Sequence, residues 1–353
     1  MFGRKQQQSL EGAGTAVQTT GTVNYTVINQ GLSREEARSL FLDLFRDNLL
    51  ELKGMAQKTA LDRGAEITEK FLSKLADEHP EGLKAAQTPD FQDALFTVQK
   101  EHAKAGDDDL ADLLVDLLVD RTKQDNRNLM QIVLNESLHT APKLTASQIS
   151  LLSILFFFKN VRNRSANTIG ELGQYFERHI GPIVENIAIG EANFAHLQFT
   201  ACGATSLGQI TLEEIFVRTY PGLFNRGFDE ARLDVIQIAP AHRENLIITC
   251  LNDATKLQFA ALNMDVLEQK LSEIAIVEPQ AQLIKNLFAE GSLDHQEVRS
   301  KVLAAAPSLE SLLDKWGAST LKNFNLTSVG MAIGHANIKR YAGEFAPLSI
   351  WIN

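Results

Sequence analysis

Residues 32–79, LSREEARSLFLDLFRDNLLELKGMAQKTALDRGAEITEKFLSKLADEH, predict one very long amphipathic helix around which the rest of the chain is organised. Ser33 and Glu36 form a capping box at its start. Pro80 ends it, because the residue before a proline avoids the helical region. The apolar side chains recur at steps of three and four, the period of a helix: Phe41, Phe45, Leu49, Leu52, Met55, Ala56, Ala60, Ile67, Phe71 and Leu75.

A continuous helix of this length would measure roughly 70 Å, at about 1.5 Å per residue, which is more than one compact core can cover. Gly54 and Gly64 are weak points, because glycine is a poor helix former. Either the helix breaks near one of them and folds back within the subunit, or a second copy of the chain covers the face between Phe41 and Leu75. The second alternative predicts a homo-oligomer.

The chain has 353 residues, a formal net charge of −10 and two cysteines, Cys202 and Cys250. An acidic chain lacks the basic footprint that nucleic-acid-binding proteins usually carry, so we expect no nucleic-acid partner. Two distant cysteines without CxxC spacing favour a reducing compartment. The first residues also lack the apolar segment of a signal peptide, and together these features favour a cytoplasmic protein.

The longest apolar run is ISLLSILFFF, residues 149–158. It is too short to span a bilayer, which needs about 20 residues, so we expect a buried helix and no transmembrane segment. Lys159, Arg162 and Arg164 follow the run, and docking at a membrane interface is the alternative.

Composition and turn residues divide the chain into five segments. Residues 1–30 are expected to be a largely disordered polar tail with one candidate strand near Tyr25, which alternatively pairs with a partner's sheet. The long helix fills residues 31–79, a helical domain residues 80–143, an α+β domain residues 144–290 and a winged-helix-like module residues 291–353. The expected fold class is therefore mainly α, with minor β structure in the C-terminal half.

Periodicity and capping residues place the shorter elements. Helices are expected to begin at the N-caps Asp90, Asp108 or Asp109, and Thr145. Further helices are expected at residues 126–140, 167–180, 212–219, 265–274, 279–289, 294–305 and 308–317, and strands at 197–202, 233–238, 246–250 and 348–352. The last strand should pair with residues 197–202. In the final segment two short helices precede LTSVG, which runs into another helix, a pattern typical of winged-helix modules.

The sequence contains no P-loop, GxSxG, HExxH or GxGxxG motif. We therefore assign no catalytic, cofactor-binding or metal-binding residues, and no cofactor. Asp112, Asp116 and Asp120 form a stripe at four-residue spacing, which suggests a metal site. A stripe that is solvated or meets basic side chains, such as Arg121 or Arg127, is the favoured interpretation, because Ca²⁺ or Mg²⁺ needs oxygens from more than one element.

Three weaker patterns have ordinary explanations. Glu136 and His139 form an ExxH pair, but di-iron bundles need that pair twice and no second copy is present. The segment GATSLG, residues 203–208, is better explained as a turn than as a phosphate loop. Cys202 with His196 or His242 would suggest a thiol–imidazole pair, and a buried inert cysteine is favoured instead.

Four stretches resemble landmarks of an uncharacterised bacterial protein family that carries locus-style names and no assigned activity. They are GLSREEARSLFLDLF (31–45), QIVLNESLHTAPKLTASQ (131–148), LTSVGMAIGHANIKR (326–340) and LSIWIN (348–353). The start of the chain also resembles the N-termini of various bacterial defence and mobile-element proteins. The resemblance implies a setting and supplies no functional residues.

These observations predict a non-enzymatic, self-associating interaction or scaffold protein of the bacterial cytoplasm, with an unknown protein partner and a role in phage defence or on a mobile element. The first alternative is a winged-helix-type transcriptional regulator that uses the last module on DNA. The second is an enzyme with an unrecognised site. A basic groove on the last module would favour the regulator, and a deep pocket with converging polar groups would favour the enzyme.

Overall fold

A computed structural model describes residues 32–48, 54–124, 126–343 and 345–352 as a mostly helical protein with two small antiparallel sheets. The helices are α1 (Arg34–Asn48), α2 (Met55–Glu78), α3 (Pro89–Ala105), α4 (Asp108–Thr122), α5 (Leu129–Thr140), α6 (Ala146–Asn160), α7 (Ile169–His179), α8 (Glu191–Phe199), α9 (Leu212–Thr219), α10 (Ala231–Val235), α11 (Pro240–Leu246), α12 (Met264–Glu273), α13 (Gln280–Glu290), α14 (His295–Ala305), α15 (Glu310–Ala318) and α16 (Ser328–Ala342). The strands are β1 (Gly203–Thr205), β2 (Ile247–Thr249), β3 (Leu257–Phe259) and β4 (Phe324–Leu326). Short 3-10 helices are η1 (Pro80–Gln87), η2 (Ala141–Lys143), η3 (Pro307–Leu309), η4 (Thr320–Asn323) and η5 (Leu348–Ile350).

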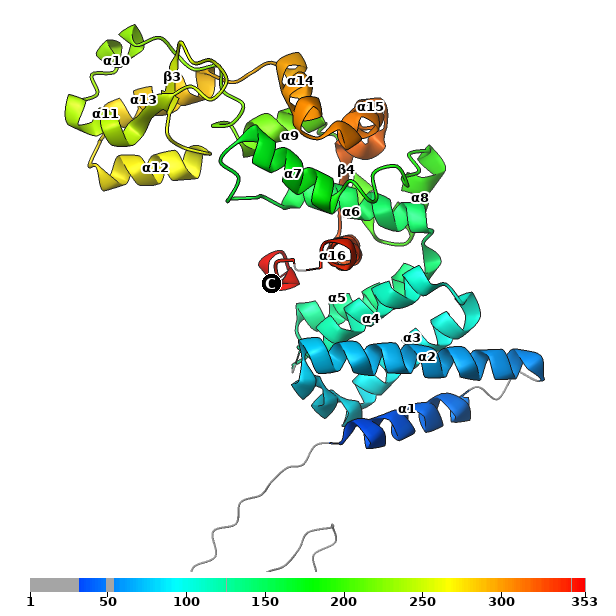
Figure 1. Cartoon of the computed structure of the whole chain (residues 1–353). Helices are drawn as coiled ribbons and strands as arrows, with labels where there is room; N and C mark the ends of the chain where they lie inside the picture. Colours follow the sequence, from blue (N-terminus) through cyan, green and yellow to red (C-terminus); the bar gives the residue numbers. More distant parts are fainter. Residues whose placement is uncertain (1–31, 49–53, 125, 344, 353) are drawn as a thin grey trace, which may run out of the picture.

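The N-terminal stretch forms two helices and not one continuous helix. Gly54 directly precedes α2 with φ of +65°, a left-handed conformation that glycine adopts without steric cost. Helix α2 folds back against α1, as Figure 1 shows, and the rings of Phe41 and Phe71 lie 6.4 Å apart across the pair. Gly64 makes room for the ring of Phe45, which a side chain at that position would hit. Of the two alternatives, the break near a glycine is the one that forms.

Much of the described apolar face of this stretch is buried inside the subunit, although Met55 at the start of α2 is 87% exposed. Phe41, Phe45, Ile67 and Phe71 are fully buried among described residues of the same chain. Phe41 contacts Phe91 of α3 at a ring distance of 6.2 Å, so α3 covers the face that a second copy was expected to cover. The length of the predicted helix therefore no longer argues for a homo-oligomer.

The predicted N-caps are correct where the signal is a reciprocal pair. Ser33 and Glu36 exchange backbone and side-chain hydrogen bonds of 2.8 and 3.2 Å, and Thr145 forms a full capping box with Gln148. The observed N-caps of α3 and α4 lie one or two residues before the predicted ones. Thr88 precedes α3 because Pro89 takes the first helical position, and the side chain of Asp107 accepts the cap bond of α4 from Leu110.

Helix α6 contains the ISLLSILFFF run and is buried throughout it, which confirms the buried-helix interpretation. Helix α16 packs along α6 and also contacts α5 and α4, so that it lies between the N-terminal helices and the second half of the molecule (Figure 1). Asn337 of α16 donates a buried hydrogen bond of 2.8 Å to the hydroxyl of Ser153 on α6. No described helix combines the length and the apolar character needed to cross a lipid bilayer.

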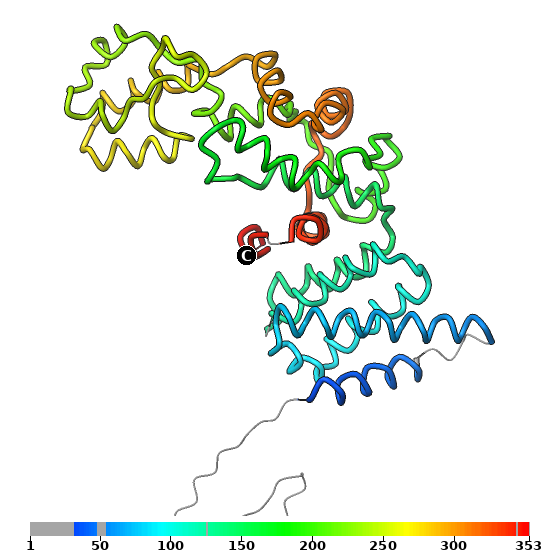
Figure 2. The backbone as a smooth tube through the Cα atoms, in the orientation of Figure 1, coloured from blue at the N-terminus to red at the C-terminus, as the bar shows by residue number. Residues whose placement is uncertain are grey.

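The buried apolar residues of the described chain gather in two main clusters. The larger one runs from Ala37 to Ile352 and joins α1–α9 with α14–α16. The second holds α10–α13 and the β2–β3 sheet around Phe259 and Phe288. Figure 2 shows this second cluster as the yellow-green to yellow lobe at the end of the molecule away from α1–α5.

The predicted strands are partly wrong. Residues 197–202 are the end of α8 and a turn in which Ala201 has a φ of +57°, and residues 233–238 include the end of α10. Strand β2 confirms the prediction at 246–250. The C-terminal residues 348–350 form η5 and pair with no strand, and it is β4 that pairs with β1. The candidate strand near Tyr25 lies outside the described residues.

Candidate functional site

A ladder of ion pairs joins α2 to α4 and uses the aspartate stripe. Lys70 Nζ lies 3.4 Å from Asp112 Oδ1, and one helical turn later Lys74 Nζ lies 2.5 Å from Asp116 Oδ1. The pairs follow from the four-residue spacing on both helices, which sets successive charges on one face. The carboxylates of the stripe therefore meet lysines of a neighbouring helix.

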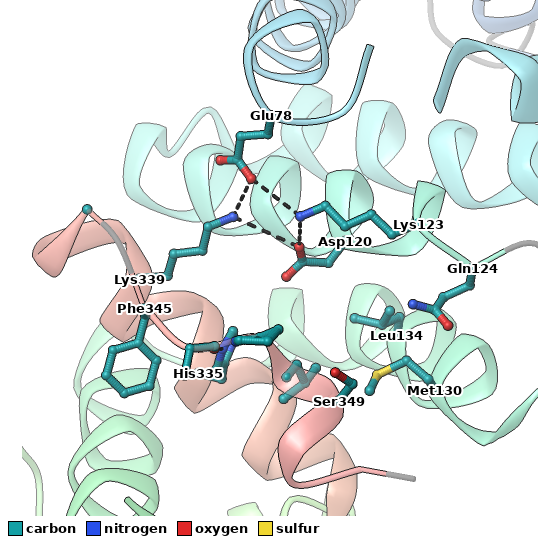
Figure 3. A pocket seen from close by; sticks show the side chains of 14 residues that line it. Glu78, Asp120, Lys123, Gln124, Met130, Leu134, His335, Lys339, Phe345 and Ser349 are labelled. Carbon is teal, nitrogen blue, oxygen red and sulfur yellow. Dashed lines mark hydrogen bonds and ion pairs between the residues drawn. The ribbon is translucent and has the colours of Figure 1, made fainter. Parts of the chain in front are cut away.

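The ladder ends in a network around Lys339 of α16. Its ammonium lies 2.5 Å from Glu78 Oε2, 3.5 Å from Asp116 Oδ1 and 3.9 Å from Asp120 Oδ1. Lys123 contacts Glu78 and Asp120 at 3.5 and 2.7 Å, so each of these two carboxylates bridges two lysines, as Figure 3 shows. The network ties α2, α4 and α16 together across 261 residues of sequence between Glu78 and Lys339.

Burial sets the electrostatics of this network. The side chain of Asp116 is fully buried, and burial raises the pKa of its carboxyl above the usual value while Lys74 and Lys339 act in the opposite direction. Burial also acts to lower the pKa of Lys339, but the carboxylates of Asp120, Glu78 and Asp116 outweigh it and raise that pKa. Lys339 therefore stays cationic at neutral pH.

A pocket of about 610 Å³ opens beside this network. We call it the ion-pair pocket (Figure 3). It is lined by charged residues of the network, by Gln124 after α4, by apolar side chains of α5, by His335 of α16 and by the C-terminal segment, which we define as the described residues 343 and 345–352. The lining residues are Glu78, Asp120, Lys123, Gln124, Met130, Leu134, His335, Lys339, Gly343, Phe345, Ala346, Pro347, Leu348 and Ser349.

His335 holds the C-terminal segment against α16. Its Nε2 lies 2.7 Å from the carbonyl oxygen of Ala346, so Nε2 carries a proton and donates. The ring is 2% exposed, and burial lowers its pKa, which keeps the imidazole neutral. Nδ1 is then an acceptor, and no described residue donates to it. Farther along the segment, Trp351 Nε1 donates to the carbonyl of Asn160 at 2.8 Å and its ring packs edge-on against Phe156.

The structure supports the basic-partner interpretation of the aspartate stripe and changes its partners. Lysines from α2 and α16, with Lys123 at the C-cap of α4, contact Asp112, Asp116 and Asp120. Arg121 turns away to Asp90, Asn135 and the carbonyl of Gln124. Among the described residues no three His, Cys, Asp or Glu side chains converge as a metal site would require.

Cys202 forms no contact with His196 or His242 among the interactions of the described residues. Cys202 is fully buried, its Sγ contacts Thr200, and burial raises the pKa of the thiol, which makes it a poor nucleophile. His196 pairs instead with the side chain of Gln148, about 3.1 Å away. His242 lies on α11, in the separate α10–α13 lobe. The expected burial of Cys202 is confirmed.

The two remaining patterns are the Glu136–His139 pair and the segment GATSLG, residues 203–208. Glu136 and His139 are both exposed on α5, and no described ligand set forms around them. Residues 203–205 of GATSLG are strand β1, where Gly203 faces the ring of Phe324, and only residues 206–208 leave the sheet. The expected turn is therefore limited to residues 206–208, where the chain bends at Leu207.

Sequence reasoning missed the ion-pair pocket because its parts lie far apart in the chain. Lys339 falls in the stretch LTSVGMAIGHANIKR, but nothing near it signals Glu78 or Asp120 as its partners. The only local sign was the regular spacing of Asp112, Asp116 and Asp120.

Comparison with known proteins identifies the family and goes no further. A family model with the description ":-like" matches residues 31–352, and the chain belongs to that family of locus-named proteins, which has no assigned activity. No curated protein and no solved structure gives a significant match. The family resemblance inferred from the four sequence stretches is confirmed.

Proposed function

We propose that this chain is a non-enzymatic interaction protein whose protein partner inserts a short segment into the ion-pair pocket. One observation carries the proposal. The pocket lies where the N-terminal helices, α16 and the C-terminal segment meet, and its charged groups are already paired with one another.

The lining chemistry favours an uncharged peptide segment. Lys339, Lys123 and the two bridging carboxylates satisfy each other, so an added ion would have to break these pairs. Met130, Leu134 and Leu348 offer apolar contacts, whereas Gln124 and Ser349 offer hydrogen bonds. A pocket with mostly apolar walls and a few polar groups is the usual form of a specific binding site.

The enzyme alternative has less support from this geometry. A general acid or base works best with a pKa near the operating pH. In the ion-pair pocket the pKa of Lys339 moves upward, away from neutrality, and His335 is held neutral with one nitrogen committed to a backbone carbonyl.

The regulator alternative also has less support. In a winged-helix module the helix that enters the DNA groove must be exposed, but α16, which follows LTSVG, is buried along most of its length. Strand β4 pairs with β1, outside residues 291–353. With the net charge of −10, we expect no sequence-specific DNA complex in about 150 mM salt, and a gel-shift or fluorescence assay at that salt tests this.

Three parts of the proposal rest on the sequence alone. A bacterial setting and a role in phage defence rest on the resemblance, a cytoplasmic location rests on the two distant cysteines and the composition of the first residues, and self-association is kept although the length of the predicted helix no longer argues for it. Light scattering of the purified protein over a range of concentrations tests the self-association.

The partner proposal is tested by blocking the pocket. Ser349 is an exposed residue in the wall of the pocket, so we expect Ser349→Arg to fill the entrance without disturbing the core. The matched control is Ser272→Arg, at an exposed position of α12. We expect affinity purification from cells of the natural source to recover a partner with the wild type and Ser272→Arg but not with Ser349→Arg. Recovery of the same proteins by all three would refute the proposal.

A further inference from the structure

A second pocket, of about 620 Å³, lies on the other side of the C-terminal segment. We call it the cationic pocket. It is formed by the end of α6 and the loop that follows, by α7, and by the C-terminal segment, which supplies Phe345 and Ala346 to both pockets. Its lining residues are Asn160, Val161, Arg162, Asn163, Arg164, Ser165, Tyr175, His179, Phe345, Ala346, Ile350 and Trp351.

The pocket has two cations and no carboxylate in its lining. Arg162 and Arg164 are both exposed, and neither forms an ion pair or side-chain hydrogen bond with any residue that the structure describes. This contrasts with the ion-pair pocket, where the lysines are matched by carboxylates. Two unmatched guanidiniums at a concave site favour an anion, and the planar fork of arginine suits phosphate oxygens in particular.

Hydrogen bonds of Asn163 hold the loop that carries these arginines. The backbone N–H of Asn163 donates to the hydroxyl of Tyr220 at 2.8 Å, and the side chain of Asn163 accepts from the backbone N–H of Ser165 at 2.8 Å. The residue between the two arginines is therefore held while their side chains stay available. Little loop ordering would then be needed on binding, which favours affinity.

Aromatic rings form the rest of the wall. Phe345 and Trp351 are stacked at 6.1 Å with an interplanar angle of 12°, and both are partly exposed. Tyr175 and His179 lie 4.2 Å apart, and His179 also approaches Phe345 at 6.0 Å. Such a wall offers flat apolar surfaces to a planar ring, which is how proteins hold nucleobases without regard to sequence.

His179 adds one oriented polar group. The ring is 7% exposed, and its Nδ1 lies 2.8 Å from the carbonyl oxygen of Tyr175, so Nδ1 is the donor. Burial lowers the pKa of the imidazole, which leaves Nε2 as a neutral acceptor, and no described residue donates to it. An acceptor of this kind in the wall of the pocket favours a ligand with an N–H or O–H group, such as a base amine or a ribose hydroxyl.

We propose that the cationic pocket binds a free mononucleotide, with its phosphate at Arg162 and Arg164 and its base against the aromatic wall. The volume is in the range of pockets that hold one small ligand, about 300 to 1,000 Å³. A longer nucleic acid would bring further phosphates toward a chain whose net charge is −10. This inference is independent of the partner proposed for the ion-pair pocket.

Calorimetric titration of the full chain with AMP, GMP, CMP and UMP tests the proposal. We expect at least one of them to bind with a dissociation constant below about 1 mM. Ribose 5-phosphate, which lacks the base, and the matching nucleoside, which lacks the phosphate, should each bind at least about 10-fold more weakly because each loses one of the two contacts.

The matched variants are Arg162→Gln with Arg164→Gln, and Arg127→Gln on an exposed surface outside the pocket. The double variant should lose at least about 10-fold in affinity, because charge-assisted hydrogen bonds are lost, while Arg127→Gln should bind as the wild type does. All three substitutions replace exposed arginine side chains, so we expect the fold to be kept.

The proposal is overturned if none of the four mononucleotides binds, or if the double variant and Arg127→Gln bind equally well. It is also overturned if a 5′-phosphorylated single-stranded oligonucleotide binds more tightly than every mononucleotide, because the ligand would then be a nucleic-acid end.

Discussion

Replacing Asp116 by asparagine should destabilise the protein by about 2 kcal/mol, whereas the same change at Asp112 should cost less than about 1 kcal/mol. The two residues lie one turn apart on α4, and each faces a lysine of α2. They differ in burial, since the side chain of Asp112 is 50% exposed and that of Asp116 is fully buried.

The expected loss of stability in Asp116→Asn depends on which charges still compensate Lys74 and Lys339 after the substitution. Removing one member of a buried ion pair typically costs about 3 to 5 kcal/mol, because the remaining charge is uncompensated. Here the loss is smaller, because Lys74 keeps Glu78 at 3.8 Å and Lys339 keeps Glu78 at 2.5 Å and Asp120 at 3.9 Å. Relief of the desolvation that raises the pKa of Asp116 reduces the loss further. About 2 kcal/mol remains.

Urea unfolding followed by circular dichroism measures both variants. With a slope of about 2 kcal/mol per molar urea, the midpoint of the transition that unfolds α4 should fall by about 1 M for Asp116→Asn and by less than half of that for Asp112→Asn. Hydrogen exchange of α4 amides identifies that transition. Equal small shifts for the two variants would show that the buried network around Lys339 contributes nothing to stability, and the reasoning would fail.

Three further predictions follow from buried groups. Burial lowers the pKa of Lys159 to about 8, below its unfolded value of 10.5, so the unfolded state binds more protons between these pH values. The free energy of unfolding of the wild type should therefore rise from pH 8 to pH 10 relative to that of the Lys159→Met variant. Denaturation of both proteins at the two pH values checks this, and parallel profiles would contradict it. Phe45→Asp should give misfolded or insoluble protein, because Phe45 is fully buried within the subunit, whereas the exposed control Ser39→Asp should stay folded. If Phe45→Asp were instead a folded, soluble monomer on a sizing column, the result would support the interface interpretation. Truncation before Leu348 removes the buried side chains of Leu348 and Ile352 and should lower the free energy of unfolding by about 3 to 6 kcal/mol. The melting temperature should fall sharply. A truncated chain that melts like the full one would show the segment to be a free tail.

Local signals were the ones that the sequence could reveal. The capping boxes of Ser33 with Glu36 and of Thr145 with Gln148 need only residues three apart, and both form. The buried character of α6 was visible because the run is apolar on every face of a helix. The break at Gly54 had a local cause, but the way α2 folds back against α1 depends on α3, which covers both.

The C-terminal segment shows how a pattern can be misassigned. Leu348, Ile350 and Ile352 alternate with other residues and predicted a strand. In the structure Leu348 and Ile352 are buried, whereas Ile350 between them is 58% exposed. Two buried positions four apart fit one helical turn, and in a strand all three would have shared a face. A run of five residues is too short to separate the two periods.

The candidate sites could not be predicted because they are assembled by tertiary packing. Glu78 and Lys339 come from opposite ends of the chain, and only α16 packing between the two halves brings them together. The sequence shows Arg162 and Arg164 as cations after an apolar run, but the aromatic wall that faces them comes from α7 and from the C-terminal segment. No spacing in the sequence reports those contacts.

The proposal that a partner segment occupies the ion-pair pocket is tested most directly by a photo-cross-linking amino acid placed at Ser349, with the same group at Ser272 as the control. In cells of the natural source, irradiation should give one discrete cross-linked product at position 349, containing a second protein joined through a short segment, and none at position 272. An absence of any product at position 349, or the same products at both positions, would contradict the account.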